Sequence, residues 1–118
     1  MALGDAGAAK RGTMVGTMAL IRIAALDELP PGSVLERQAG AQVVALCNHG
    51  GHIRVFHGLC PHHGGPLGQG NLVDGRLVCP WHAWEFRVED GALDFNPAIR
   101  LRQYCVQIHG DDLCVEIS

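Results

Sequence analysis

Two short loops of the sequence each combine a cysteine with a histidine. The first is Cys60-Pro61-His62, and the second, separated from it by sixteen residues, is Cys79-Pro80-Trp81-His82. A binuclear [2Fe–2S] centre can take both thiolates on one iron and both imidazoles on the other. We therefore predict that Cys60 and Cys79 hold an inner iron, and that His62 and His82 hold an outer iron nearer to solvent and to a redox partner.

This mixed ligand set has an electronic consequence. Two ferric ions, two bridging sulfides and two thiolates sum to zero charge when the imidazoles are neutral, whereas four thiolates would add two negative charges. An electron enters the less negative centre more easily, so its reduction potential lies at about −150 to +300 mV, against about −400 mV for plant-type ferredoxins with four cysteines. The pattern therefore predicts a carrier of single electrons.

Zinc is the alternative metal, because it also binds two cysteines and two histidines tetrahedrally. Zinc sites usually group cysteines with cysteines and histidines with histidines, at spacings such as C-x2–4-C and H-x3–5-H. This sequence mixes the two residue types within each pair. An iron–sulfur centre is therefore favoured over a zinc-stabilised interaction module.

The neighbours of the two pairs suit a buried centre. Pro61 and Pro80 stiffen each loop directly after its cysteine. Leu67 and Trp81 are expected to keep water away from the centre. Glycines allow sharp backbone bends nearby and let amide groups approach sulfur. These glycines are Gly64, Gly65, Gly68 and Gly70.

The composition excludes several other functions. The chain has 118 residues and a formal net charge of −3, and Lys10 is the one lysine among nine basic residues. This length fits one domain, and no basic run supports nucleic-acid binding. No stretch approaches the about 20 apolar residues of a membrane-spanning helix. Residues 1–17 show no secretory signal and are expected to be a flexible extension, so we expect a cytoplasmic protein.

Many short strands at close spacing, without a convincing amphipathic helix, predict an all-β sandwich or barrel-like domain. The expected strands are residues 19–23, 34–38, 42–47, 53–56, 72–73, 76–78, 84–88, 104–108 and 113–117. One helical turn is expected before Pro30, and Asp74-Gly75 is expected to form a hairpin turn. Side chains 104, 106 and 108 should share one face of their strand, as should side chains 113, 115 and 117.

Three cysteines lie outside the two pairs. Cys47 ends an apolar run and is expected to be a small buried core residue. Cys105 and Cys114 lie in the C-terminal hairpin. A disulfide between them is disfavoured by a reducing cytosol and by their expected strand registers, which do not place them opposite each other.

The run CPHHGGPLGQGNLVDGRLVCPWHAWEF, residues 60–86, resembles the signature of Rieske proteins, in which C-x-H-x-G-x-x-L precedes C-x-x-H. From about Ala19 onward the chain is similar to the small Rieske ferredoxins that serve ring-hydroxylating oxygenases. The resemblance implies one Rieske-type antiparallel β-sandwich over residues 18–118 with one [2Fe–2S] cluster. Its cluster-binding part, about residues 57–98, would contain two ligand loops and a third, covering loop at Asn96-Pro97-Ala98.

The same resemblance implies the partners. The protein would take electrons from a flavin-dependent NAD(P)H ferredoxin reductase and pass them to a terminal aromatic-ring-hydroxylating oxygenase. It would be a monomer or weak dimer, and it would not itself be an enzyme. The alternative is a Rieske-like small subunit of an NADH-dependent nitrite reductase or of another multicomponent oxidoreductase.

The sequence departs from the Rieske proteins of respiratory cytochrome bc complexes at four positions. Those proteins join the two loops by a disulfide, and the corresponding residues here are Gly65 and Trp81. They also place a serine and a tyrosine where Trp84 and Phe86 stand, and those hydroxyl groups donate hydrogen bonds to the cluster and its thiolate. Fewer donors disfavour the reduced state, so a potential near the low end of the Rieske range is expected.

Overall fold

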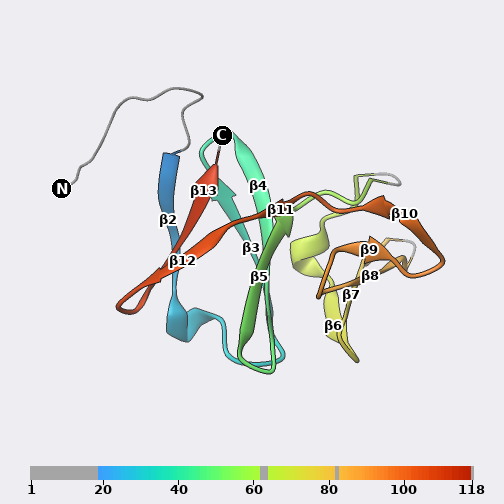
Figure 1. Ribbon diagram of the computed structural model, residues 1–118, viewed down its shortest axis with the longest axis horizontal. Coiled ribbons are helices and arrows are strands. Elements are labelled where there is room, and N and C mark those ends of the chain that lie inside the picture. The colour runs from blue at the N-terminus through green and yellow to red at the C-terminus, as the bar shows by residue number, and fades with distance from the viewer. Residues whose placement is uncertain (1–18, 62–63, 82, 118) are drawn as a thin grey trace.

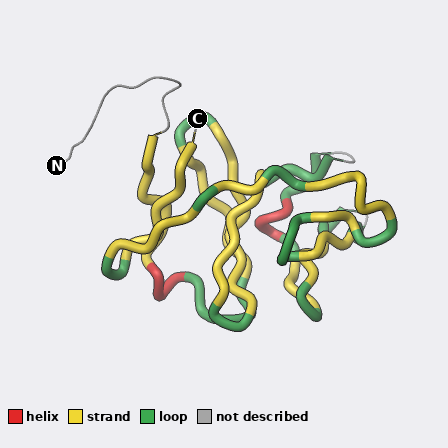
Figure 2. The backbone as a smooth tube through the Cα atoms, in the orientation of Figure 1, coloured by secondary structure: helices red, strands yellow, loops and turns green. Residues whose placement is uncertain are grey.

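The computed structural model describes residues 19–61, 64–81 and 83–117, and this part of the chain is almost entirely β-structure (Figures 1 and 2). Its helical segments are the short 3₁₀ turns η1 (Leu26–Glu28) and η2 (Leu67–Gln69). No helix in the described ranges has the length and apolar character needed to cross a bilayer. The all-β prediction is confirmed.

The strands form three antiparallel sheets. The four-stranded sheet has the order β11-β5-β4-β3 and contains β3 (Val34–Ala39), β4 (Gln42–His49), β5 (His52–His57) and β11 (Gln103–Tyr104). The three-stranded sheet has the order β12-β13-β2 and contains β2 (Ala19–Ala25), β12 (Val106–His109) and β13 (Asp112–Ile117). The five-stranded sheet has the order β10-β9-β8-β7-β6 and contains β6 (Asn71–Val73), β7 (Arg76–Val78), β8 (Glu85–Arg87), β9 (Ala92–Leu93) and β10 (Asn96–Arg100).

The four-stranded sheet is the middle layer, because its strand β4 is buried on both faces. Side chains alternate between the faces of a strand. Val44 and Leu46 therefore pack with the three-stranded sheet, whereas Ala45 and Cys47 pack with the cluster-binding part. All four are fully buried. The apolar run that the sequence shows in β4 thus reflects two separate hydrophobic cores.

Most of the predicted elements are confirmed. The helical turn before Pro30 is η1, and the Asp74-Gly75 turn joins β6 to β7 with positive φ values of 49° and 76°. Positive φ at both central residues is typical of the type I′ hairpin turn. Along β13, Leu113, Val115 and Ile117 are all buried, as their alternation predicts.

Two predictions need correction. The strand expected over residues 104–108 is divided at Cys105, because β11 pairs with β5 in one sheet and β12 pairs with β13 in another. Tyr104 is therefore buried while Ile108 is 53% exposed. The segment Asn96-Pro97-Ala98, expected as a loop, belongs to β10. This strand lies at the edge of its sheet, where a proline is tolerated.

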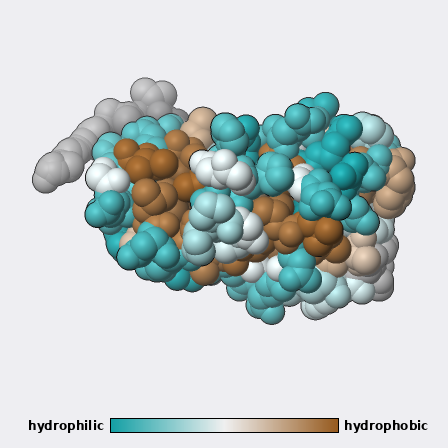
Figure 3. All heavy atoms as spheres, turned by 90° about the horizontal axis from the view of Figure 1, so that it is seen from below, coloured by the Kyte–Doolittle hydropathy of each residue, from teal (hydrophilic) through white to brown (hydrophobic). Residues whose placement is uncertain are grey.

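Apolar surface is unevenly distributed. Seen from below, apolar side chains gather around the end of the molecule formed by the three-stranded sheet (Figure 3). Exposed apolar residues also occur near the ligand loops, where Leu59 is 41% exposed, Trp81 57% and Phe95 69%. The surface beside the loops is therefore partly apolar.

The three cysteines outside the ligand loops differ in accessibility. Burial raises the pKa of the Cys47 thiol to about 11, whereas Cys105 is exposed. Both Cys105 and Cys114 are free thiols. The β12–β13 register pairs Cys114 with Gln107, and the backbone of Cys105 accepts a hydrogen bond from Glu116. The two cysteines are therefore not opposite each other, as expected.

These differences predict the order in which the thiols react. At pH 8 only about one Cys47 thiol in a thousand would be ionised, and the thiolate is the reactive form. Iodoacetamide should therefore label Cys105 in the native holoprotein and leave Cys47 unlabelled, as read by peptide mass spectrometry. Denatured protein, in which Cys47 reacts, is the control. Native labelling of Cys47 at the rate of Cys105 would contradict the burial described here.

Candidate metal centre

The first ligand loop, residues 60–65, is a closed backbone turn. The Cys60 amide donates a hydrogen bond to the Gly65 carbonyl at 2.8 Å, and the Gly64 amide donates to the Cys60 carbonyl at 2.8 Å. Gly64 has a φ of +73°, in the left-handed region that favours glycine. The two hydrogen bonds thus join the described ends of this loop, Cys60 on one side and Gly64 and Gly65 on the other.

The second ligand loop, residues 79–84, repeats this turn. The Cys79 amide donates to the Trp84 carbonyl at 2.8 Å, and the Ala83 amide donates to the Cys79 carbonyl at 3.0 Å. Ala83 has a φ of +55° and occupies the place that Gly64 has in the first loop. A non-glycine residue in this conformation carries strain of about 1 kcal/mol, which the closed turn maintains. The sequence did not predict this residue, because no local pattern of residues indicates an alanine in the left-handed backbone conformation.

Two hairpins hold the loops in place. The first loop follows β5 and is anchored where the Gly58 amide donates to the Val43 carbonyl at 2.9 Å. A Cβ atom on Gly58 would lie 2.9 Å from that same oxygen, so only glycine allows this approach. The second loop connects β7 to β8, whose residues Val78 and Glu85 pair directly before and after it.

The short helix η2 links one loop to the other. A Cβ on Gly68 would lie 2.5 Å from the Cβ of Glu36 in β3, and a Cβ on Gly70 would lie 2.0 Å from the carbonyl oxygen of Val78 in β7. The backbone therefore packs directly against both sheets. These glycines were expected to provide sharp bends, but neither has a positive φ, and close packing is the reason for them.

The two loops meet at Gly65. A Cβ atom there would lie 2.7 Å from Cys79 Sγ and 3.3 Å from two ring atoms of Trp81. Gly65 and Trp81 are the positions that a disulfide would join in the cytochrome bc type of Rieske protein. Here they form a non-covalent contact instead. Trp81 is 57% exposed. It borders this junction, but more than half of its surface is open to solvent.

The residues present fit an iron–sulfur cluster. Cys60 and Cys79 are only 3% and 2% exposed, and both belong to one hydrophobic core with Leu67 and Phe86. Two thiolates thus reach a dry region from two matching turns, as an inner iron requires. The predicted ligands His62 and His82 lie outside the described residues. Within the described ranges, no group of three or more His, Cys, Asp or Glu side chains could hold another metal ion.

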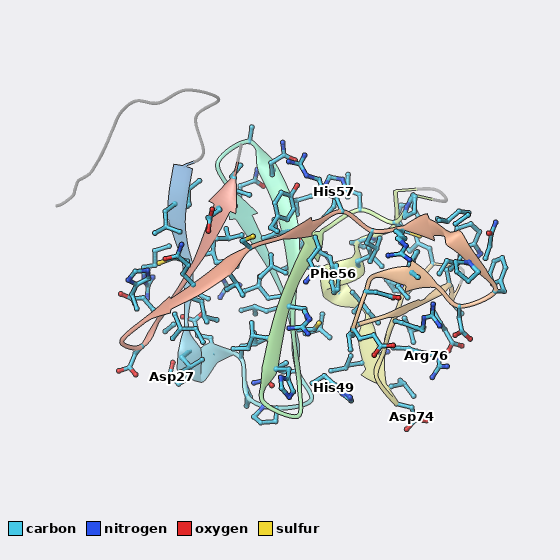
Figure 4. The ribbon with its side chains drawn as sticks, in the orientation of Figure 1. Asp27, His49, Phe56, His57, Asp74 and Arg76 are labelled. Atoms are coloured by element: carbon cyan, nitrogen blue, oxygen red, sulfur yellow. The ribbon has the colours of Figure 1, made fainter. Side chains whose placement is uncertain are left out.

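The histidines outside the motif differ in exposure. His49, His52 and His109 are exposed, and His63 lies outside the described residues. His49 faces Asp74 and Arg76 across a cavity of about 280 Å³ between the β4–β5 and β6–β7 turns (Figure 4). His57 is half-buried at the end of β5, close to the first ligand loop.

The contact at Gly65 predicts a steric effect of a single methyl group. Gly65→Ala should destabilise the cluster-loaded protein by about 1–3 kcal/mol, because the added Cβ overlaps Cys79 Sγ. Iron and acid-labile sulfide per chain, together with the rate of bleaching of visible absorbance, measure the effect.

Gly64→Ala is the matched control for this substitution. It introduces the same methyl group one residue earlier, where no non-neighbouring atom of the described residues lies within 4 Å. Its cost is limited to the left-handed backbone, about 1 kcal/mol. Equal cluster loss in both variants would contradict a steric role of Gly65.

Comparison with known proteins agrees with this geometry. The family described as the Rieske [2Fe–2S] domain matches residues 19–105. The ferredoxin component of biphenyl 2,3-dioxygenase from Rhodococcus jostii (strain RHA1) is 33% identical over 102 residues, which cover 86% of this chain and 95% of that protein.

Solved structures show the same fold. The ferredoxin of carbazole 1,9a-dioxygenase from Nocardioides aromaticivorans IC177 superposes with a TM-score of 0.74 at 26% identity, covering 81% of this chain and 95% of that one. A protein from Mycobacterium tuberculosis, provisionally described as the small subunit of NADH-dependent nitrite reductase, gives a TM-score of 0.77 at 18% identity, covering 86% and 97%, and shows likeness of fold alone. The chain belongs to the Rieske [2Fe–2S] domain family and is an electron carrier with one Rieske-type cluster.

Proposed function

We propose that Cys60 and Cys79 hold the inner iron, that His62 and His82 hold the outer iron, and that the loaded protein serves a terminal aromatic-ring-hydroxylating oxygenase. It receives its electrons from a flavin-dependent NAD(P)H reductase. When bound, the cluster takes up and releases one electron at a time. We propose further that the carrier works in the cytoplasm as a monomer or weak dimer.

One observation carries the ligand assignment. The two cysteines close matching turns and lie in one hydrophobic core, and the Cys79 thiol lies next to Gly65 of the other turn. The chain's residues do three things for electron transfer: they bind the metal, exclude water from the thiolate side, and hold the two loops against each other. The names of the relatives, which are ferredoxin components of oxygenase systems, support the oxygenase as electron acceptor.

The second candidate function is that of a Rieske-like small subunit of an NADH-dependent nitrite reductase or of another multicomponent oxidoreductase. It is supported by the likeness of fold to the Mycobacterium tuberculosis protein, at 18% identity. The dioxygenase ferredoxin of Rhodococcus jostii, at 33% identity over nearly its whole length, favours the first candidate.

Histidine variants test the ligand assignment. His62→Ala and His82→Ala should each lose the electron paramagnetic resonance signal of the dithionite-reduced cluster, because an outer iron left with one protein ligand is not retained. His109→Ala is the control and should keep both the signal and two irons per chain, since His109 is exposed on β12. A protein without this signal and with stoichiometric zinc would overturn the assignment. Reconstituted turnover with the reductase and oxygenase tests the partners separately.

The midpoint potential should lie below zero, in the lower part of the range of about −150 to +300 mV. Phe86, at the position of a hydroxyl donor in the cytochrome bc type, is 1% exposed and shares the core of the two cysteines. Phe86→Tyr should raise the potential by about 40 mV, because a hydrogen bond that favours the reduced state by about 1 kcal/mol shifts a one-electron couple by that amount. Redox titration followed by visible absorbance measures the shift.

Phe95→Tyr provides the matched control for the potential. It adds the same hydroxyl group at a side chain that is 69% exposed and should leave the midpoint unchanged. A wild-type midpoint well above zero would show that the lack of hydroxyl donors does not set the potential.

A further inference from the structure

The turn between β4 and β5 carries one histidine on each side. His49 ends β4 and His52 begins β5, and the strand register pairs them directly. Gly50 and Gly51 between them have φ values of 60° and 94°, as in a two-residue type I′ turn. Residues paired in this way point to the same face of a sheet, with Cβ atoms about 4.5–5.5 Å apart. His49 and His52, which we call the histidine pair, therefore present neighbouring imidazoles.

The histidine pair lies at the rim of the space between two sheets. His49 and His52 both line a cavity of about 160 Å³, whose other wall contains Val88 and Glu89 directly after β8. The same face of β4 is buried further along the strand, where Cys47 belongs to the core of the cluster-binding part. Both histidines are exposed, so an ion can reach them from solvent.

Hydrogen bonding within the fold does not occupy the ring nitrogens of the pair. Neither imidazole makes a hydrogen bond or an ion pair with the residues that the structure describes. The ring of His49 packs beside Gly75, where a Cβ atom would lie 3.4 Å from its Nε2. His109 differs, because its Nε2 lies 2.9 Å from Gln107 Oε1. The histidine pair is therefore available to act as ligands.

Two charged side chains share the cavity with the histidine pair. Arg54 and Glu89 both line it, one positive and one negative. Their formal charges cancel, so the lining of this cavity does not repel a cation. The chemistry of the imidazole nitrogens then decides what binds.

A second cavity, of about 280 Å³, adjoins the first and shares part of its lining. Its charged residues on the side of the five-stranded sheet include Asp74, Arg76 and Arg87. Arg76 pairs with Asp94 at 3.2 Å, and Arg87 pairs with Asp90 at 3.6 Å. These two arginines are balanced by acidic partners, and Asp74 adds a negative charge on this side. The surroundings of the pair therefore do not oppose a cation.

Two neighbouring imidazoles have a specific chemical use. Neutral imidazole is a common metal ligand that suits Zn²⁺, Cu²⁺ and Ni²⁺, whereas Mg²⁺ and Ca²⁺ prefer oxygen. Once one imidazole has bound an ion, the second meets it at a high effective concentration, so the pair binds more tightly than two separate histidines. Within the described ranges, no third His, Cys, Asp or Glu side chain completes such a site. The ligand set is therefore two histidines and solvent water.

We propose that the histidine pair chelates one divalent transition-metal ion of the class that prefers imidazole, with Zn²⁺ as its representative. Each histidine gives one ring nitrogen, and the bound ion joins the end of β4 to the start of β5 across the turn. The first ligand loop begins at the other end of β5, after His57, about 17 Å along the strand (Figure 4). The site is thus separate from the metal centre and independent of the proposed function.

A titration of the oxidised holoprotein with Zn²⁺ locates the site. The imidazole nitrogen signals of His49 and His52, followed by two-dimensional NMR, should shift together and saturate as one site, with half-saturation below about 1 mM. The signals of His109, an exposed histidine outside the pair, should stay in place. Visible absorbance is recorded throughout, so that loss of the cluster is not mistaken for binding. A shift of only one histidine of the pair, or no saturation, would overturn the proposal.

Single and double variants test whether the two histidines act as one chelate. H49Q and H52Q should each raise the Zn²⁺ concentration for half-saturation by about tenfold or more, as measured by calorimetry. H49Q/H52Q should bind little more weakly than either single variant, because one substitution already breaks the chelate. H109Q is the matched control and should bind Zn²⁺ like wild type. Wild-type affinity in either single variant of the pair, or losses that simply add in the double variant, would refute chelation.

Two charge variants separate ligands from neighbours. R54Q should bind Zn²⁺ about twofold or more tightly than wild type and E89Q about twofold or more weakly, because each removes one charge from the cavity. Both differences should shrink at high salt, whereas the loss in H49Q should persist. A loss in E89Q as large as that in H49Q would make Glu89 a third ligand, and the assignment to two histidines would be wrong.

Discussion

The structure depends on how closely two backbone turns approach each other at Gly65. There is no room for a methyl group between this residue and Cys79 Sγ, and the ring of Trp81 lies against the same point. Contacts this close are specific. Protein interiors are packed as densely as molecular crystals, so even one added carbon atom disturbs the packing. The contact brings together two cysteines that lie nineteen positions apart in the chain.

Much of the remaining architecture keeps these two turns in register. β4 carries the first loop through its contact with Gly58, while β7 and β8 carry the second. η2 lies between these supports, and the absence of side chains at Gly68 and Gly70 lets its backbone touch both. The four-stranded sheet, buried on both faces, ties this region to the three-stranded sheet behind it. The position of each thiol therefore depends on contacts in all three sheets.

The same arrangement divides the surroundings of the centre into unlike sides. The thiolate side is dry and lined by leucine and phenylalanine, which suits a cluster whose oxidised form is close to neutral. The surface beside it combines exposed apolar side chains with two arginines. The cluster-binding part is therefore apolar inside and mixed in character at its surface.

Local chemistry was readable from the sequence alone. The spacing of Cys60, His62, Cys79 and His82 predicted an iron–sulfur centre and its ligand set, since each pairing is local and thiolates and imidazoles have few alternative uses in such a motif. The alternation of apolar and polar residues likewise predicted β13, and turn residues predicted the Asp74-Gly75 hairpin. Each of these features depends on a few neighbouring residues, so it can be predicted without knowledge of the contacts between distant segments.

Only the tertiary structure decided what depends on contacts between distant segments. It divided the predicted strand at Cys105, because sheet partners are chosen by the whole core. It placed Asn96-Pro97-Ala98 in an edge strand, and it showed that Gly65 is needed for closeness and not for a bend. It also brought Arg100 and Arg102 beside Cys60, forty positions earlier in the chain. Such neighbours arise from burial and pairing across sheets, which no local pattern of residues records.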